Sequence, residues 1–294
     1  MDEHDFLTER FAADRTHLVA VAYRMLGSLS EAEDAVQEAW LRARRAGTDG
    51  VENLTGWLTT VVARVCLNML RSRQSRREDP LDAGVPEPPL GSETGGDPEE
   101  EALLADSVGV ALLVVLDMLT PAERLAFVLH DMFAVPFDEI GPMLERSPAA
   151  VRQLASRARR RIKGGTPAPD ADMIRQREAV EAFLAATRGG NFDALVALLH
   201  PDVVLTADPS VIPTPQPVVV SGAATVAKGA MAATGRARFT GLALLDDRIG
   251  LAMAPRGRLS LVLAFTVTED GITQIDVIAD RERLGRMDLA VLDD

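Results

Sequence analysis

The segments LTPAER at residues 119–124 and ERSPAAVRQLASRARRRIK at residues 145–163 decide the architecture of the middle of this chain. In the first segment, Thr120 and Glu123 have the spacing of a capping box, with a proline at the first helical position, so a helix is predicted to begin there. The second segment has a Ser-Pro pair at 147–148, which is typical of an N-cap followed by the first residue of a helix. These signals predict the starts of two helices.

The remaining residues of this region follow the helical repeat. A short helix is predicted from Phe137 to Leu144, with Ile140 facing inward. The last helix has an apolar stripe on one side and a row of cations on the other. This layout is typical of a helix-turn-helix DNA reader. A basic, solvated helix that closes a small bundle is the alternative interpretation. The apolar stripe consists of Val151, Leu154, Ala155, Ala158 and Ile162.

The net charge of the whole chain is opposite in sign to the charge of this helix. The 294 residues carry a formal net charge of −13, and nearly half of them are hydrophobic. A net acidic protein approaches DNA poorly by itself, because nonspecific affinity comes from neutralised phosphates. Residues 78–101 contain nine acids and no Lys or Arg, whereas arginines cluster at 42–45, 71–77 and 157–161. We therefore expect a partner to bring this chain to DNA.

Cysteine and histidine are sparse. The single cysteine, Cys66, excludes an internal disulfide and fits a reducing cytosol, so a cytoplasmic location is expected. It falls in a helical apolar pattern, which favours a buried small hydrophobe over a reactive thiol. Four scattered histidines show no metal-ligand spacing, and no apolar run reaches the length of a membrane span. We expect no metal, no cofactor and no membrane contact.

The N-terminal 78 residues are predicted to be helical. A first helix should end at Gly27, and Ser30 with Glu33 predicts a second capping box that opens a helix to about Ala46. A third helix is predicted from Leu54 to Arg73, with a buried apolar stripe and a separate polar line.

Two breaks then divide the chain. Residues 79–101 are rich in Pro, Gly and acids, which predicts a flexible linker. Residues 102–165 contain the helix-turn-helix, and residues 166–172 are a second predicted linker. The fold class is therefore multidomain, with two all-α domains at 1–78 and 102–165.

Residues 173–294 predict an α+β domain. Two helices, at 173–188 and 192–199, precede β-rich sequence, and a further helix is expected at 222–233. The sequence Glu-Asp-Gly at 269–271 predicts a hairpin turn. Strands are predicted at 203–207, 217–220, 239–245, 259–267 and 272–278.

Residues 5 to 163 resemble the group 4, or extracytoplasmic-function, sigma factors of bacterial RNA polymerase. DAVQEAW at 34–40 looks like their core-binding region, and WLTTVVAR at 57–64 looks like their −10 element region. Residues 119–160 look like their −35 domain. The three motifs stand in the family's order and spacing. The resemblance implies an alternative sigma factor that binds core RNA polymerase, directs it to −10 and −35 promoter elements and starts transcription.

The resemblance also implies the residues that make these contacts. Asp34, Gln37 and Glu38 are expected to bind core polymerase, because carboxylates and an amide suit a basic helical clamp. A merely solvated helix face is the other interpretation of these three residues.

Opening of the −10 element requires stacking surfaces and cations for the backbone. Trp57 is either a stacking residue or a core anchor. The residues expected at the −10 element are Asn53, Trp57, Thr60, Arg64, Asn68 and Arg71.

At the −35 element, Arg152 and Ser156 are expected to contact base edges, while Arg157 and Arg160 are expected to contact phosphates.

The C-terminal domain resembles the SnoaL-like, NTF2-like fold found in SigJ-like sigma factors, chiefly through LLHPDV at 198–203. That subset carries a Gly-rich motif after the first strand, where ADPS stands at 207–210, and an Asn-Pro-Asp-Lys-like motif near its end, where ADRER stands at 279–283. The sequence at 85–88 is similar to the subset's linker motif without its Trp. These departures bear on regulatory contacts and leave the polymerase and DNA contacts unaffected.

Two alternatives remain open for function. Related folds include cyclases, so His200, Asp202 and Asp276 are candidate acids or bases, although a regulatory contact with the sigma domains is favoured and no enzyme activity is expected. The chain could also be a helix-turn-helix regulator with a sensory domain, which would bind duplex DNA without polymerase.

Overall fold

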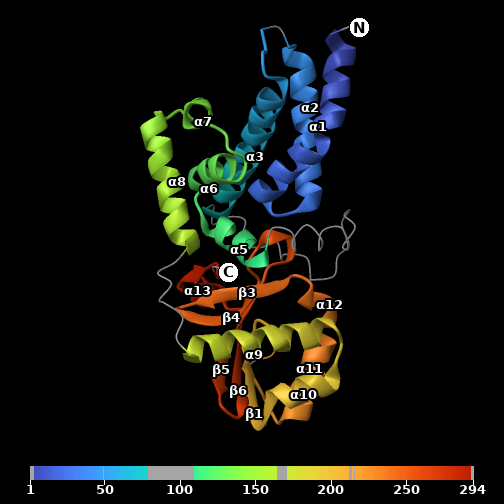
Figure 1. The fold of residues 1–294 in the computed structure, drawn as a ribbon, viewed down its shortest axis with the longest axis vertical. Coiled ribbons are helices and arrows are strands. Elements are labelled where there is room, and N and C mark those ends of the chain that lie inside the picture. The colour runs from blue at the N-terminus through green and yellow to red at the C-terminus, as the bar shows by residue number, and fades with distance from the viewer. Residues whose placement is uncertain are drawn as a thin grey trace. The chain divides into compact units, whose positions relative to one another are not determined.

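The computed structural model of the chain describes residues 3–48, 50–78, 109–163, 171–211, 214 and 216–292. The described residues divide into two compact units, each considered by itself. The first unit contains the N-terminal helices and most of the helix-turn-helix region; the second contains the C-terminal sheet and its helices (Figure 1). The predicted linkers at 79–101 and 166–170 lie outside the described residues, so the proposed domain boundaries stay predictions. Residues 171 and 172 begin a helix.

Three long helices form the N-terminal part of the first unit. They are α1 (Glu3–Leu26), α2 (Leu29–Ala46) and α3 (Leu54–Glu78), and each contacts the other two. The predicted end of α1 at Gly27 is confirmed, since that glycine has φ of 81°, a left-handed conformation that stops a helix. The predicted Ser30 capping box is wrong. Helix α2 begins two residues earlier, after Ser28, so Ser30 is already inside the first turn.

The helix-turn-helix region follows the predicted order. Both halves of the Thr120–Glu123 capping box are present, and the Ser147 hydroxyl accepts a hydrogen bond from the Ala150 amide at 3.3 Å. Helix α6 is followed directly by a π-helical turn at Val128–Met132. The elements are α5 (Val110–Met118), α6 (Pro121–Phe127), η2 (Val128–Met132), α7 (Phe137–Leu144) and α8 (Pro148–Lys163).

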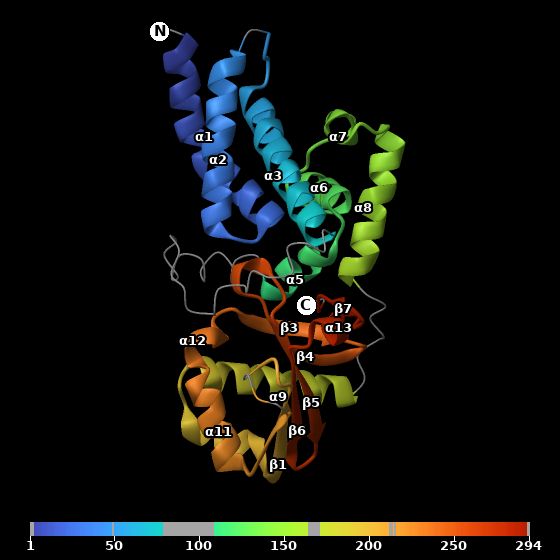
Figure 2. The ribbon, with the colours of Figure 1, turned by 180° about the vertical axis from the view of Figure 1, so that it is seen from behind.

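The second unit is an α+β domain, which confirms the predicted class. In the described part of this unit, seven strands form one sheet in the order β2-β1-β6-β5-β4-β3-β7, in which only the β1–β6 pair is parallel. The long helix α9 packs on β3, β4 and β5 (Figures 1 and 2). The strands are β1 (Leu199–Ala207), β2 (Val218–Ser221), β3 (Thr240–Leu245), β4 (Arg248–Met253), β5 (Leu261–Thr268), β6 (Gly271–Ile278) and β7 (Leu289–Ala290).

Apolar side chains from both layers fill the interior of this domain. Phe183 of α9 meets Phe265 of β5 edge to face, with ring centroids 5.3 Å apart. The predicted hairpin turn is confirmed between β5 and β6, and Gly271 has φ of 112°, which favours glycine there. Strands β4 and β7 were not predicted. The helices are α9 (Ala171–Arg188), α10 (Phe192–Leu198), α11 (Ala223–Ala232), α12 (Thr234–Ala237), η3 (Pro255–Gly257) and α13 (Arg281–Leu284).

No helix among the described residues is long and apolar enough to cross a membrane.

Candidate polymerase and nucleic-acid interfaces

The acidic residues predicted to bind polymerase lie on the outer face of α2. Asp34 and Gln37 are exposed, and Glu38 is half-buried and accepts a salt bridge from Arg42 at 2.8 Å. The opposite face of α2 is buried in the helical bundle. The core side of this helix is apolar, and none of the three polar residues belongs to it. The buried residues are Leu29, Ala32, Ala35, Val36, Ala39 and Ala43.

Polar residues predicted for the −10 element follow one line along α3. Arg64, Asn68 and Arg71 are exposed at intervals of three and four residues, which places them on one side of the helix. Thr60 begins this line and is half-buried; its hydroxyl donates to the Gly56 carbonyl at 3.0 Å. The structure thus brings four of the six predicted residues together on α3.

Asn53 and Trp57 stand at the start of the same helix. The amide oxygen of Asn53 accepts a hydrogen bond from the Gly56 N–H at 3.0 Å, which caps the first turn of α3. The capping bond gives Asn53 a structural role in addition to the predicted DNA contact. Trp57 is half-buried, so its ring has both a packed and an accessible part.

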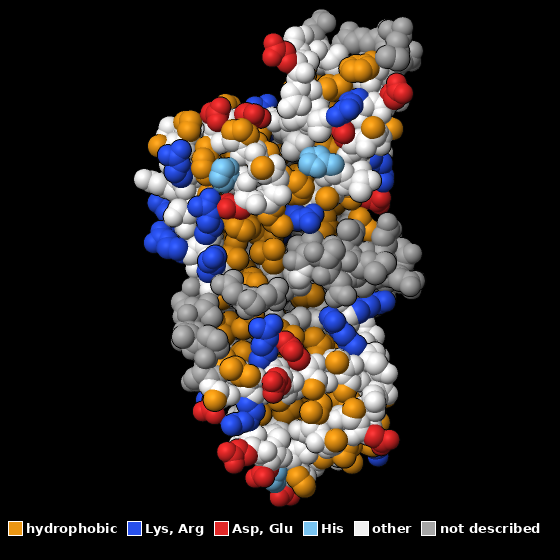
Figure 3. Space-filling view, viewed as in Figure 1, with side chains coloured by type: hydrophobic (Ala, Val, Ile, Leu, Met, Phe, Trp, Pro, Cys, Tyr) orange, Lys and Arg blue, Asp and Glu red, His pale blue; other side chains and the backbone are white. Residues whose placement is uncertain are grey.

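Helix α8 presents the residues predicted for the −35 element. Arg152, Ser156, Arg157 and Arg160 are all exposed, while the predicted apolar stripe on the other side is buried. Lys and Arg side chains gather over this helix in the space-filling view (Figure 3). The location of these cations on one exposed helix face is the arrangement that a recognition helix requires.

Arg152 is held in position by aromatic side chains of the preceding helices. Its guanidinium lies 5.5 Å from the centre of the Phe137 ring, a cation–π distance. Phe137 in turn stacks on His130, with ring centroids 3.7 Å apart. Arg159, one helical turn from the predicted contacts, instead forms a salt bridge with Asp131 at 2.6 Å.

A buried arginine in this unit was not predicted from the sequence. Arg124, the last residue of the opening segment, is only 2% exposed. Burial lowers the pKa of its guanidinium to about 10, and the neighbouring Asp117 carboxylate partly offsets that effect. Arginine is rarely fully buried, so the residue type gave no signal of this burial.

The candidate acids and bases of the C-terminal domain do not converge. The His-Pro-Asp sequence at 200–202 lies within β1 at an irregularity in its pairing with β6. The His200 ring nitrogen Nδ1 accepts a hydrogen bond from the Asp202 amide at 3.1 Å. Asp276 is paired opposite Thr206, near the other end of β1, and accepts from the Gln274 side chain.

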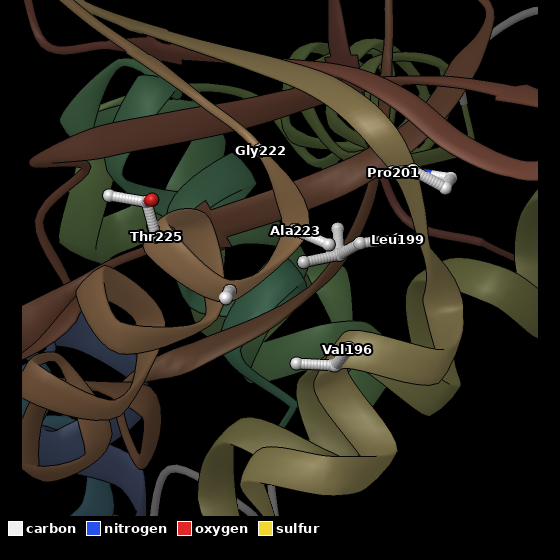
Figure 4. A pocket seen from close by; sticks show the side chains of 7 residues that line it. Val196, Leu199, Pro201, Gly222, Ala223 and Thr225 are labelled. Atoms are coloured by element: carbon white, nitrogen blue, oxygen red, sulfur yellow. The ribbon is translucent and has the colours of Figure 1, made fainter.

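A shallow pocket of about 440 Å³ opens beside β1 and α11 (Figure 4). Apolar and small side chains form most of its wall, and the Thr225 hydroxyl is the single side-chain polar group of the lining. None of the three candidate acids or bases lines it. Its lining residues are Val196, Leu199, Pro201, Gly222, Ala223, Ala224 and Thr225.

The two motif positions that depart from the SigJ-like pattern meet in space. The Asp208 carboxylate accepts hydrogen bonds from the backbone amides of Ala279 and Asp280 at 3.2 Å, and a salt bridge from Arg283 at 2.8 Å. These bonds tie the end of β1 to the start of α13. The side chain of Asp208 therefore has a structural role at this end of the sheet.

Two family models match the helical part of the chain. Sigma-70 region 2 matches residues 11–76, and Sigma-70 region 4 matches residues 109–162. The probable ECF RNA polymerase sigma factor SigI of Mycobacterium tuberculosis (strain CDC 1551 / Oshkosh) is 37% identical over 203 residues, which cover 69% of this chain and 70% of SigI. The chain belongs to the ECF sigma factors. The predicted resemblance is thereby confirmed.

Two further similarities involve SigJ. The ECF RNA polymerase sigma factor SigJ of Mycobacterium tuberculosis (strain ATCC 25618 / H37Rv) is 44% identical over 204 residues, or 67% of this chain. That match spans 64% of the length of SigJ. A crystal structure of Mycobacterium tuberculosis SigJ is similar at 32% identity and a TM-score of 0.44, over 95% of this chain and 98% of that one.

Cys66 offers a simple check of the packing of α3. Burial raises the pKa of its thiol to about 12. Because the thiolate is the reactive form, the native chain at pH 8 should react with a thiol reagent at least about 1,000-fold more slowly than the unfolded chain. Stopped-flow labelling with and without denaturant measures this ratio. Rapid labelling of the native chain would show that the interior around Cys66 is open.

Proposed function

We propose that this chain is an alternative sigma factor that binds core RNA polymerase, directs it to −10 and −35 promoter elements and starts transcription. The observation that carries the proposal is the presence, in one chain, of an exposed acidic face on α2 and of two exposed basic faces, on α3 and α8. A protein that binds polymerase with one surface and DNA with two others has the parts that promoter recognition requires. The acidic net charge is then compatible with DNA binding, because polymerase provides much of the attraction.

Asp34, Gln37 and Glu38 are proposed to bind a basic surface of core polymerase. The support is their exposure on a helix whose other face is apolar. Charge complementarity of this kind fixes the register of a complex and speeds its formation.

The line of Thr60, Arg64, Asn68 and Arg71 on α3 is proposed to contact the opened −10 strand. Arginine suits the backbone phosphates, and an amide suits base edges. Trp57 and Asn53, at the start of the helix, are proposed to flank this line, although the capping bond uses the amide oxygen of Asn53 and leaves only its NH₂ group for DNA.

On α8, Arg152 and Ser156 are proposed to read base edges at the −35 element, because residues in the N-terminal half of a recognition helix enter the major groove. Arg157 and Arg160 are proposed to contact phosphates. The Phe137 ring supports this role, since it holds the Arg152 guanidinium before DNA arrives.

The C-terminal domain is proposed to regulate the sigma domains in cis, without enzyme activity of its own. Described residues 109–115 and 160–163, at the two ends of the helix-turn-helix region, belong to the same compact unit as the C-terminal sheet. The Val291 amide donates to the Ile162 carbonyl at 2.9 Å, and a Cβ atom added at Gly241 would lie 2.9 Å from the Val110 Cβ. These contacts support the proposal that the C-terminal domain restrains the helix-turn-helix region at both of its ends.

Removal of residues 171–294 should change transcription from a cognate promoter. We expect at least about a 5-fold change in run-off transcript, the lower range of typical coupling between sites. Purified core polymerase with either the full or the shortened chain gives the comparison. Equal yields from the two proteins would count against regulation in cis.

A single substitution tests the same contact in the full chain. Gly241→Ala should displace the start of α5, because the new methyl group would meet Val110 within 3.0 Å. Gly229→Ala in α11 is the matched control, since nothing lies within 4 Å of its added Cβ. Transcript yield should change for Gly241→Ala alone. The same yield from both variants would argue that the Val110 contact carries no regulation.

A further inference from the structure

Within the first unit, the helix-turn-helix region packs directly on the N-terminal bundle. Helix α6 lies against α3 (Figures 1 and 2). The π-helical turn η2 contacts α1. The region-4-like and region-2-like helices are therefore closed on each other in the free chain. We call this arrangement the closed state.

Phe133 is the aromatic contact that holds the closed state. Its ring meets that of His17 of α1 edge to face at 5.3 Å, and the Arg24 guanidinium of α1 lies 5.3 Å from its centre. The His17 ring is fixed in turn by a hydrogen bond of 3.2 Å with the Thr59 hydroxyl. These contacts favour closure.

Arg124, at the centre of the same interface, opposes closure. It is among the largest fully buried side chains of the described chain, and its Nε–H donates to the Arg24 carbonyl at 3.3 Å. Nη1 lies 3.5 Å from the Asp117 carboxylate, whereas Nη2 is buried without a hydrogen-bond partner. Arg73 adds a second positive charge that further disfavours the protonated form of Arg124.

A buried guanidinium with an unsatisfied donor raises the free energy of the state that buries it. Separation of the two helical parts would let water hydrogen-bond to Nη2 and would remove this free-energy cost. The interface thus combines one favourable aromatic contact with one unfavourable buried charge, and both come from the helix-turn-helix side.

Promoter binding requires the two DNA-binding parts to separate. The −10 and −35 elements are about 25 base pairs apart, which is about 85 Å of duplex at 3.4 Å per base pair. The longest helix of the unit, α3, has 25 residues and so spans about 38 Å. A closed body of such helices cannot hold both elements at once.

We propose that the buried Arg124 guanidinium keeps the closed state weak, so that core polymerase and promoter DNA can open it. The inference rests on the proposed sigma-factor function. Arg124 acts here as a conformational switch residue that touches neither polymerase nor DNA in the closed state. Its replacement by an apolar side chain of similar length removes the buried charge and the unsatisfied Nη2 donor. The Asp117 carboxylate that loses its partner is 20% exposed and keeps contact with water, so closure should strengthen.

Distances between two spin labels in the full chain test this proposal. Arg45→Cys and Arg146→Cys place labels at exposed positions of the two halves, and the buried Cys66 thiol stays unlabelled. Arg124→Met should lower the open fraction about 10-fold. Phe133→Ala should raise it about 10-fold. Arg175→Met, which removes an exposed arginine paired with Asp172 in α9, is the control and should leave the distances unchanged.

The deciding result is that the two substitutions change the open fraction in opposite directions. If Arg124 only stabilised the fold, Arg124→Met would open or unfold the chain, as Phe133→Ala opens it, and the proposal would be overturned. An unchanged open fraction in Arg124→Met would overturn it as well.

Addition of core polymerase and promoter DNA to the labelled wild-type chain should lengthen the distance; a complex that keeps the short distance would contradict the required opening. Failure of the sigma-factor function would give a different result. The chain would then bind no polymerase, while the label distances of the free chain would still change with the Arg124 and Phe133 substitutions.

Discussion

Reversal of charge at Asp34 and Glu38 should lower the affinity for core polymerase by about 100-fold or more. Two lysines in place of two carboxylates would set like charges against a basic surface, and such juxtapositions cost several kcal/mol. Both residues lie on the exposed side of α2, so the helix and its buried apolar face should survive the change. Affinity is measured by fluorescence anisotropy of the labelled full chain with purified core polymerase.

Glu181→Lys provides a matched control for this experiment. Glu181 forms an i,i+4 salt bridge of 2.8 Å with Arg177 on α9 and is as exposed as Glu38 in its pair with Arg42. Its charge reversal changes the net charge in the same direction without touching α2. If polymerase affinity fell equally in the α2 variant and in Glu181→Lys, the effect would come from overall charge. The proposed interface on α2 would then be wrong.

Arg152→Ala should weaken binding of the holoenzyme to its preferred −35 sequence by about 10- to 100-fold and relax the preference at one base pair. A bidentate contact from arginine to a base edge contributes about 1–3 kcal/mol of discrimination. The substitution leaves the buried stripe of α8 intact, since Arg152 lies on the exposed side. Selection from a promoter library with randomised −35 positions measures both the affinity and the preference.

Arg160→Ala is the comparison for the base-edge role. Loss of a phosphate contact should weaken binding to every library member to a similar extent and reduce its salt dependence. If Arg152→Ala behaved in the same way as Arg160→Ala, with the sequence preference retained, Arg152 would be a phosphate contact and the base-edge assignment would be wrong.

The elements that the sequence predicted well are those with local signals. The Thr120–Glu123 capping box and the Ser147 N-cap use side chains within three residues of the amides they satisfy, so their spacing alone locates the helix starts. The apolar stripe of α8 likewise follows from the helical repeat. The exposure of the polar faces on α2, α3 and α8 was predictable as well, because each face lies opposite such an apolar stripe.

Features that depend on tertiary contacts were missed. Ser30 and Glu33 have capping-box spacing, but the glycine at position 27 ends α1 so close to α2 that the second helix begins at Leu29. Strand β4 contains Gly250 and Ala252 and is almost fully buried, so it lacks the alternation of an exposed strand. The burial of Arg124 depends on its contact with α1, 100 residues away in sequence.

Reconstituted transcription shows whether this chain directs core polymerase to promoters. Purified core polymerase, with and without this chain, is incubated with a library of promoter fragments, and both complex formation and transcript start sites are recorded. We predict that the chain co-elutes with core polymerase and that transcripts start downstream of fragments sharing paired −10 and −35 sequences only when it is present. A chain that binds duplex DNA alone, fails to bind polymerase and adds no transcript would be a helix-turn-helix regulator of another class and would contradict the account.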